Sequence, residues 1–108
     1  MAARSKRIVR YSRLAAEDRE EIYTYTAHQR GVDQAERYSN FLADAAANIV
    51  DGVIAVRPVE GADGAYASFV KWPKAKYGHF LIFEYEPDGI HILRILHSSM
   101  DVSQHPWE

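Results

Sequence analysis

The sequence predicts an α+β fold in which a helical hairpin packs on one face of an antiparallel-rich sheet. Two apolar runs, at 79–86 and 90–97, flank Pro87–Gly89, a Pro-Asp-Gly turn that predicts a β-hairpin. Two earlier stretches, about 13–30 and 34–51, carry apolar residues at three- to four-residue spacing and are joined by a very short link. The predicted element order is β-α-α-β-β-β.

Length and composition limit the classes of protein to which this chain can belong. The 108 residues allow one modest core, so we expect a single domain over residues 1–108. With 47% hydrophobic and 26% charged residues, the chain reads as an ordinary globular protein. It has no Cys, which excludes disulfides and thiolate metal sites. No long apolar run and no secretory signal are present, so we expect no membrane contact and a cytoplasmic location.

The charges are unevenly distributed along the chain. Net charge is −2, yet residues 1–13 hold five Lys/Arg and no acid, while residues 17–21 hold four acids. A third cluster, at 71–79, contains Lys71, Lys74, Lys76 and His79. A nucleic-acid-binding protein of this size is usually far more basic overall. We therefore expect no direct nucleic-acid partner and interpret each cluster as solvated surface.

The first half of the chain supplies a strand and the helical hairpin. Ile8, Val9 and Tyr11 predict a short strand, and Ser12 can cap a helix over about 13–30 that ends before Gly31. Asp33 with Glu36 is a capping-box pattern for the second helix, about 34–51. A link of two or three residues makes the two helices antiparallel.

The second half supplies the rest of the sheet. Residues 53–64 read as a loop, and 65–72 as a strand that Pro73 must end or place at an edge. The tail after His97 can form at most one helical turn, near 100–104.

Pairing Glu86 with Ile90 would sort the hairpin's side chains onto two faces. The face expected under the helices carries Leu81, Phe83, Tyr85, Leu93 and Ile95, together with the histidines at 79, 91 and 97. The other face carries Phe80, Ile82, Ile90, Ile92 and Leu96, with Glu84 and Arg94 as a diagonal ion pair. Nothing else in the chain looks able to cover that face completely, so we expect a partner there.

At this point the chain resembles a known family, the ParE branch of the RelE/ParE toxins. The resemblance starts with the first-helix pattern A-x-x-D-x-x-E-I-Y-x-Y (Ala15, Asp18, Glu21, Ile22, Tyr23, Tyr25). It continues through R-P-V-E-G at 57–61, G-H-F at 78–80, D-G-I at 88–90, I-L-R-I-L-H at 92–97 and M-D at 100–101. It covers nearly the whole chain, and its last third is the most specific part. Arg19, and Glu84 with Tyr85, depart from the family's usual pattern.

The resemblance implies a RelE/ParE-like fold and a toxin of a type II toxin–antitoxin module, paired with a ParD-like antitoxin. ParE-type toxins act on DNA gyrase, whereas RelE-type relatives cut mRNA in the ribosome. Proteins with the same fold therefore have two different activities.

An mRNA-cutting site needs a base, an acid and cationic donors around one phosphate. The candidates are Lys71, Lys74, Lys76, His79, Glu84, Arg94 and His97. Strand alternation turns Arg94 away from His97, so both can point into one shallow site only with the help of a bulge. The tail offers only His105 and Trp107. We therefore predict no catalytic residues, and keep a RelE-like ribosome-dependent endoribonuclease as the alternative.

No metal-ligand spacing and no phosphate-binding glycine loop are present, so we predict no metal and no cofactor. The leading hypothesis is a toxin that inhibits DNA gyrase by protein–protein contact, with a degenerate toxin that only binds antitoxin as a third possibility. The residues predicted to contact the antitoxin or the target are Tyr38, Leu42, Ile49, Ile82, Glu84, Ile92 and Arg94.

Overall fold

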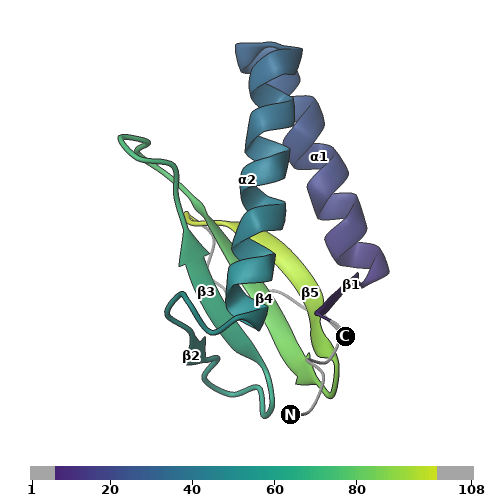
Figure 1. Cartoon of the computed structure of the whole chain (residues 1–108). Helices are drawn as coiled ribbons and strands as arrows, with labels where there is room; N and C mark the ends of the chain where they lie inside the picture. Colours follow the sequence, from purple (N-terminus) through teal and green to yellow (C-terminus); the bar gives the residue numbers. More distant parts are fainter. Residues whose placement is uncertain (1–6, 100–108) are drawn as a thin grey trace.

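The computed structural model describes residues 7–99 and shows a twisted sheet with two antiparallel helices on one face (Figure 1). Within these residues the strand order is β1-β5-β4-β3-β2, with β1 parallel to β5 and the other pairs antiparallel. The elements are β1 (Ile8–Tyr11), α1 (Arg13–Arg30), α2 (Val32–Val50), β2 (Arg57–Pro58), β3 (Tyr66–Val70), β4 (His79–Glu86) and β5 (Gly89–His97). The predicted α+β architecture is confirmed.

Helix α1 begins as predicted. The Ser12 side chain accepts a hydrogen bond from the backbone N–H of Ala15 at 3.0 Å, which satisfies one of the free donors of the first turn. The same hydroxyl donates to the carbonyl of Leu93 at 2.7 Å and thus ties the start of the helix to β5.

The cap predicted for the second helix is wrong. Gly31 alone links the helices, with φ of 96° and ψ of 161°, a conformation open essentially only to glycine. Because one residue makes the turn, α2 already begins at Val32. Asp33 therefore lies inside the first turn, and no side chain caps the helix.

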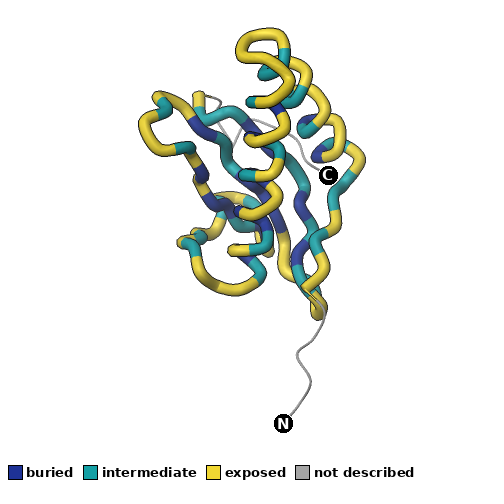
Figure 2. Tube along the Cα trace, turned by 45° about the horizontal axis from the view of Figure 1, so that its top comes forward, coloured by how far each residue is buried: buried dark blue, intermediate teal, exposed yellow. Residues whose placement is uncertain are grey.

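The core lies between the helices and the sheet. Its buried members come from both layers and include the small residues that let α2 approach the strands closely: Ala15, Tyr38, Leu42, Ala45, Ala46, Ile49, Val70, Leu81, Phe83, Ile90, Ile92 and Ile95. Figure 2 shows the same distribution, with buried positions along the central strands and exposed positions on the outer sides of the helices.

The β4–β5 hairpin is confirmed, but its register differs from the prediction at the turn. Glu86 pairs with Gly89, so the loop contains two residues instead of three. Gly89 is not a positive-φ residue. A Cβ there would lie 1.8 Å from the carbonyl oxygen of Ile8, so glycine is needed because β1 approaches so closely.

A β-bulge in β5 restores the predicted register further along the hairpin. Phe83 pairs with Ile92 while Ile82 pairs with Arg94, which leaves Leu93 as the extra residue. The bulge turns Ile90 and Ile92 into the helix-side core, so their predicted place on the other face is wrong. It also places His91 on the outer face, beside Glu84, instead of under the helices.

The loop region contains more structure than predicted. Residues 57–58 form β2 at the sheet edge, paired with Tyr66 and Ala67 of β3, so the predicted unbroken loop over 53–64 is wrong. The observed order is β-α-α-β-β-β-β. The helical turn predicted near 100–104 lies outside the described residues.

The sheet face away from the helices carries a second, smaller apolar cluster. Ala67, Ile82 and Leu96 are buried there, with Val59 of the preceding loop and Phe80 packed against them. Phe69 stays 49% exposed beside the Phe80 ring. The face is therefore apolar, as predicted, and only partly covered by residues 7–99.

Candidate functional site

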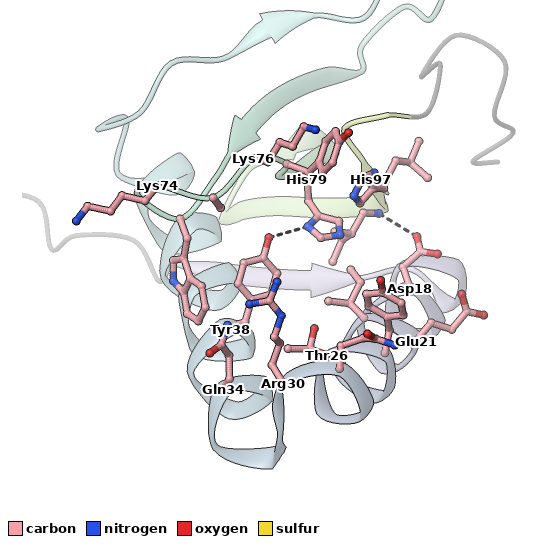
Figure 3. A pocket seen from close by; sticks show the side chains of 18 of the residues that line it. Asp18, Glu21, Thr26, Arg30, Gln34, Tyr38, Lys74, Lys76, His79 and His97 are labelled. Atoms are coloured by element: carbon pink, nitrogen blue, oxygen red, sulfur yellow. Dashed lines mark hydrogen bonds between the residues drawn. The ribbon is translucent and has the colours of Figure 1, made fainter.

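A pocket of about 820 Å³ opens between the helical hairpin and the end of the β4–β5 hairpin that lies away from its turn. Its walls come from α1, α2, the segment 72–77 and the ends of β4 and β5. In Figure 3, a dashed line joins Tyr38 to His79, and His97 lies beside His79. Lys74 and Lys76 lie on one side, and Asp18 and Glu21 on the other.

Tyr38 and His79 form the buried polar pair of the pocket. The Tyr38 hydroxyl lies 2.6 Å from His79 Nδ1. Burial raises the pKa of Tyr38 to about 12. Burial, reinforced by the neighbouring His97 and opposed by Asp18, lowers the pKa of His79 to about 4. Both groups are neutral at pH 7, so the hydroxyl donates to Nδ1 and the ring proton of His79 sits on Nε2.

His97 is the cross-strand partner of His79. The two rings meet edge to face with centroids 5.5 Å apart, and the Tyr77 ring lies 5.2 Å from His97. The backbone N–H of Ser99 donates to His97 Nδ1 at 3.1 Å, so Nδ1 is an acceptor and Nε2 carries a ring proton. The Ser99 hydroxyl also lies 2.8 Å from the same nitrogen.

Arg94 and Asp18 close the α1 side of the pocket. The guanidinium binds both carboxylate oxygens, at 2.8 and 3.0 Å, and the same carboxylate accepts the backbone N–H of Ile95 at 2.9 Å. Because β1 pairs with β5 only as far as Ile92, the next stretch of β5 is an open edge, and Asp18 occupies it. The hydrogen bond to Asp18 raises the pKa of Arg94. The predicted Glu84–Arg94 pair is therefore wrong.

Aromatic and basic side chains form the outer wall. Trp72 packs edge to face on Tyr38 with centroids 5.0 Å apart, and the Lys76 ammonium lies 5.4 Å from the Tyr77 ring centroid. Arg30, at the end of α1, also lines the pocket. The Lys74 ammonium points away from it (Figure 3). The wall therefore offers apolar surface and positive charge together.

The pocket collects five of the seven nuclease candidates: Lys74, Lys76, His79, Arg94 and His97. Arg94 reaches it by crossing the edge of β5 toward α1, a route that strict alternation of strand side chains does not predict. Lys71 donates to the carbonyl of Ala75 at 2.8 Å, and Glu84 lies on the outer face with its carboxylate 3.5 Å from His91 Nδ1.

A different constellation occupies the turn end of the hairpin. Ligand atoms of Glu84, Glu86 and His91 lie within 4.8 Å of one another, a spacing that the sequence prediction of no metal did not anticipate. Arg10 already binds both oxygens of Glu86, at 3.0 and 2.5 Å, and this bond lowers the pKa of Glu86. A cation at this position would have to compete with that guanidinium.

The seven residues predicted to contact a partner fall into two groups, those that lie only in the core and those that line the pocket or are exposed. Four are at most 4% exposed and pack in the chain's own core: Leu42, Ile49, Ile82 and Ile92. A partner docked on this structure does not reach their side chains. Tyr38 and Arg94 line the pocket and Glu84 is exposed, and their contact with a partner stays a prediction.

Sequence reasoning did not find the pocket itself. The sequence signal available was the placement of His79 and His97 on the helix-facing side, which the structure confirms. Their meeting with Tyr38 depends on how far α2 extends over the sheet, and no local pattern encodes that distance.

Comparison with known proteins identifies the family. The family model described as "ParE toxin of type II toxin-antitoxin system, parDE" matches residues 9–102. The chain belongs to the ParE toxin family. It is therefore a toxin of a type II toxin–antitoxin system.

A solved structure with the same fold is described as "Chromosomal ParDE TA system from P. aeruginosa". This ParE toxin is 21% identical to it, with a TM-score of 0.62 over 87% of this chain and 97% of that chain. No curated protein matches the sequence. Within the described residues, no helix is long and apolar enough to span a membrane.

Proposed function

We propose that this ParE toxin inhibits DNA gyrase by protein–protein contact and is neutralised by a ParD-like antitoxin, both in the cytoplasm. The observation that carries the proposal is the family match over residues 9–102. The ParDE structure with the same fold supports a ParD-type antitoxin as the partner.

The chemistry of the pocket favours contact over catalysis. A general acid or base works best when its pKa lies near the operating pH. The pKa of His79 is about 4 and that of Tyr38 about 12, and their mutual hydrogen bond occupies the Tyr38 hydroxyl and His79 Nδ1. The guanidinium of Arg94 is held by Asp18. These groups therefore stabilise the shape of a surface instead of presenting a reactive centre.

A supercoiling assay with purified gyrase and purified toxin tests this function. We expect supercoiling to fall as toxin is added, and to recover when the toxin is first mixed with its antitoxin. Undiminished supercoiling at saturating, folded toxin would remove gyrase as the target.

One observation supports the alternative function, a RelE-like ribosome-dependent endoribonuclease. His79, His97 and Lys76, residue types that suit phosphodiester cleavage, line the same pocket. Adding the toxin to a translating extract and mapping transcript ends distinguishes the two functions. Cleavage at defined positions, abolished by His97→Gln, would favour the nuclease over the gyrase inhibitor.

A further inference from the structure

We propose that the pocket holds a carboxylate side chain of the antitoxin, bound by the Nε2–H groups of His79 and His97. This inference rests on the proposed function, because it takes the ParD-like antitoxin as the partner. It adds which chemical group the toxin recognises and which atoms recognise it.

The two imidazoles are arranged as a pair of donors. In each ring Nδ1 is already engaged, by the Tyr38 hydroxyl in His79 and by the Ser99 backbone N–H in His97. With Nδ1 acting as an acceptor, each ring carries a proton on Nε2. Among residues 7–99 neither Nε2 atom has a hydrogen-bond partner, and no buried side-chain nitrogen lacks one. Both N–H groups are therefore accessible, and both rings line the pocket.

The spacing of the rings suits an acceptor with two oxygens. His79 and His97 are direct partners on antiparallel strands, and their centroids lie 5.5 Å apart. Edge-to-face packing of the rings, together with their Nδ1 partners, fixes where each Nε2–H points. A carboxylate can accept one hydrogen bond on each oxygen, which makes it a natural bidentate acceptor.

The charges around the donors favour a single anion. Arg30 and Lys76 line the pocket, and no ion pair involving either is present in the described part of the chain. Asp18 is neutralised by Arg94, which leaves Glu21 as the acid facing these two cations. The pocket therefore has an excess of positive charge on the side of Lys76.

A peptide carboxylate fits this pocket better than an RNA backbone. Successive phosphates would bring several negative charges toward Glu21, whereas one Asp or Glu side chain needs only the basic side of the pocket. Tyr77 packs on His97 and Trp72 packs on Tyr38, and both line the pocket and offer apolar surface for the neighbouring residues of a peptide. A segment with one acidic residue between apolar ones matches both features.

His97→Phe is the variant that tests the donor role. It keeps a ring of similar size against His79 and Tyr77, removes the Nε2–H, and leaves the Tyr38–His79 bond in place. His91→Phe is the matched control, because His91 lies on the same strand but on the opposite face, outside the pocket. Urea unfolding of both variants verifies that each is folded.

The measurement is the affinity of each toxin variant for the full-length antitoxin of its own module, by titration calorimetry. Losing a hydrogen bond to a charged group should weaken binding by His97→Phe about 10- to 100-fold, with His91→Phe unchanged. Each Asp and Glu of the antitoxin is then changed to Asn or Gln. We expect one such change to weaken binding to the wild-type toxin and to have little further effect on His97→Phe.

The possible results distinguish a failure of the carboxylate site from a failure of the proposed toxin–antitoxin pairing. A tight complex that His97→Phe leaves unchanged overturns the carboxylate site and leaves the toxin–antitoxin pairing intact. No complex with wild-type toxin overturns both. A third result would be that a single-stranded RNA oligonucleotide binds the toxin, that His97→Phe abolishes this binding, and that the antitoxin still binds the variant as before. The pocket would then recognise phosphate, which overturns the carboxylate site.

Discussion

The two ends of the β4–β5 hairpin carry similar residue types in opposite surroundings. At the open end, His79, His97 and the Arg94–Asp18 pair sit under the helices and around the pocket. At the turn end, His91 and the Arg10–Glu86 pair lie on the outer face. The Arg94 and Asp18 side chains are 16% and 11% exposed, whereas those of Arg10 and Glu86 are 56% and 25% exposed.

This contrast shows that burial, more than residue type, decides what a charged or titratable group contributes. The same bidentate geometry anchors α1 to β5 at one end, where water is largely excluded. At the other end it is a surface contact that solvent and salt screen. The bulge at Leu93 lies between the two ends of the hairpin. It determines which face of the sheet each residue of β5 occupies.

The largest effect should come from the buried pair. Asp18→Asn removes the carboxylate charge that pairs with Arg94 and weakens the acceptor for the Ile95 N–H. We expect the free energy of unfolding to fall by about 3 kcal/mol, measured by urea denaturation. A loss close to zero would show that α1 does not depend on this anchor.

Glu86→Gln is the matched change at the turn end. It removes the charge from the exposed pair and keeps the side chain's size, so we expect the urea midpoint to stay within experimental error of wild type. If Glu86→Gln lowered the free energy of unfolding as much as Asp18→Asn, the buried and the exposed ion pair would contribute equally to stability.

The next effect is a dependence of stability on pH that originates from His79. Burial holds the pKa of His79 at about 4 in the folded chain, whereas the ordinary value of 6.5 applies once the chain unfolds, so only the unfolded chain binds this proton between those values. Stability should therefore fall as the pH drops through this interval, by about 2 kcal/mol after allowance for partial exposure. His79→Gln should flatten the profile there, and His91→Gln should not. If the dependence of stability on pH were unchanged in His79→Gln, other titratable groups would be responsible for it.

A smaller effect is expected from the hydroxyl that binds His79. Tyr38→Phe removes the donor to Nδ1 and keeps the ring packed on Trp72, so unfolding should become easier by about 1 kcal/mol. Tyr77→Phe is the control, since Tyr77 is 52% exposed and its hydroxyl has no hydrogen bond in the described part of the chain. Equal losses in both variants would show that the Tyr38–His79 bond contributes nothing specific.

Local signals in the sequence predicted most of the fold. Ser12 marked the start of α1, Gly31 its end, and the two apolar runs around Pro87 marked the hairpin. What they could not supply was register. The bulge at Leu93 changes which residues of β4 and β5 are partners, and the alternation of apolar residues in the two strands did not predict it.

The candidate site was harder to predict for the same reason. His79, His97, Lys74 and Lys76 were all recognised as residues able to do chemistry. Their convergence requires Tyr38 from α2 to reach β4 across more than forty positions of chain. Arg94 was misplaced because its partner, Asp18, lies on α1 beside an open strand edge that only the observed strand order reveals.

Hydrogen exchange of the toxin, free and bound to its antitoxin, tests most directly whether the open end of the hairpin is the binding end. We predict that the amides of the 72–78 loop and of Ser98 exchange at least tenfold more slowly in the complex, while those of the 84–91 turn change little. Protection confined to the turn end, with the pocket loop unchanged, would contradict the account.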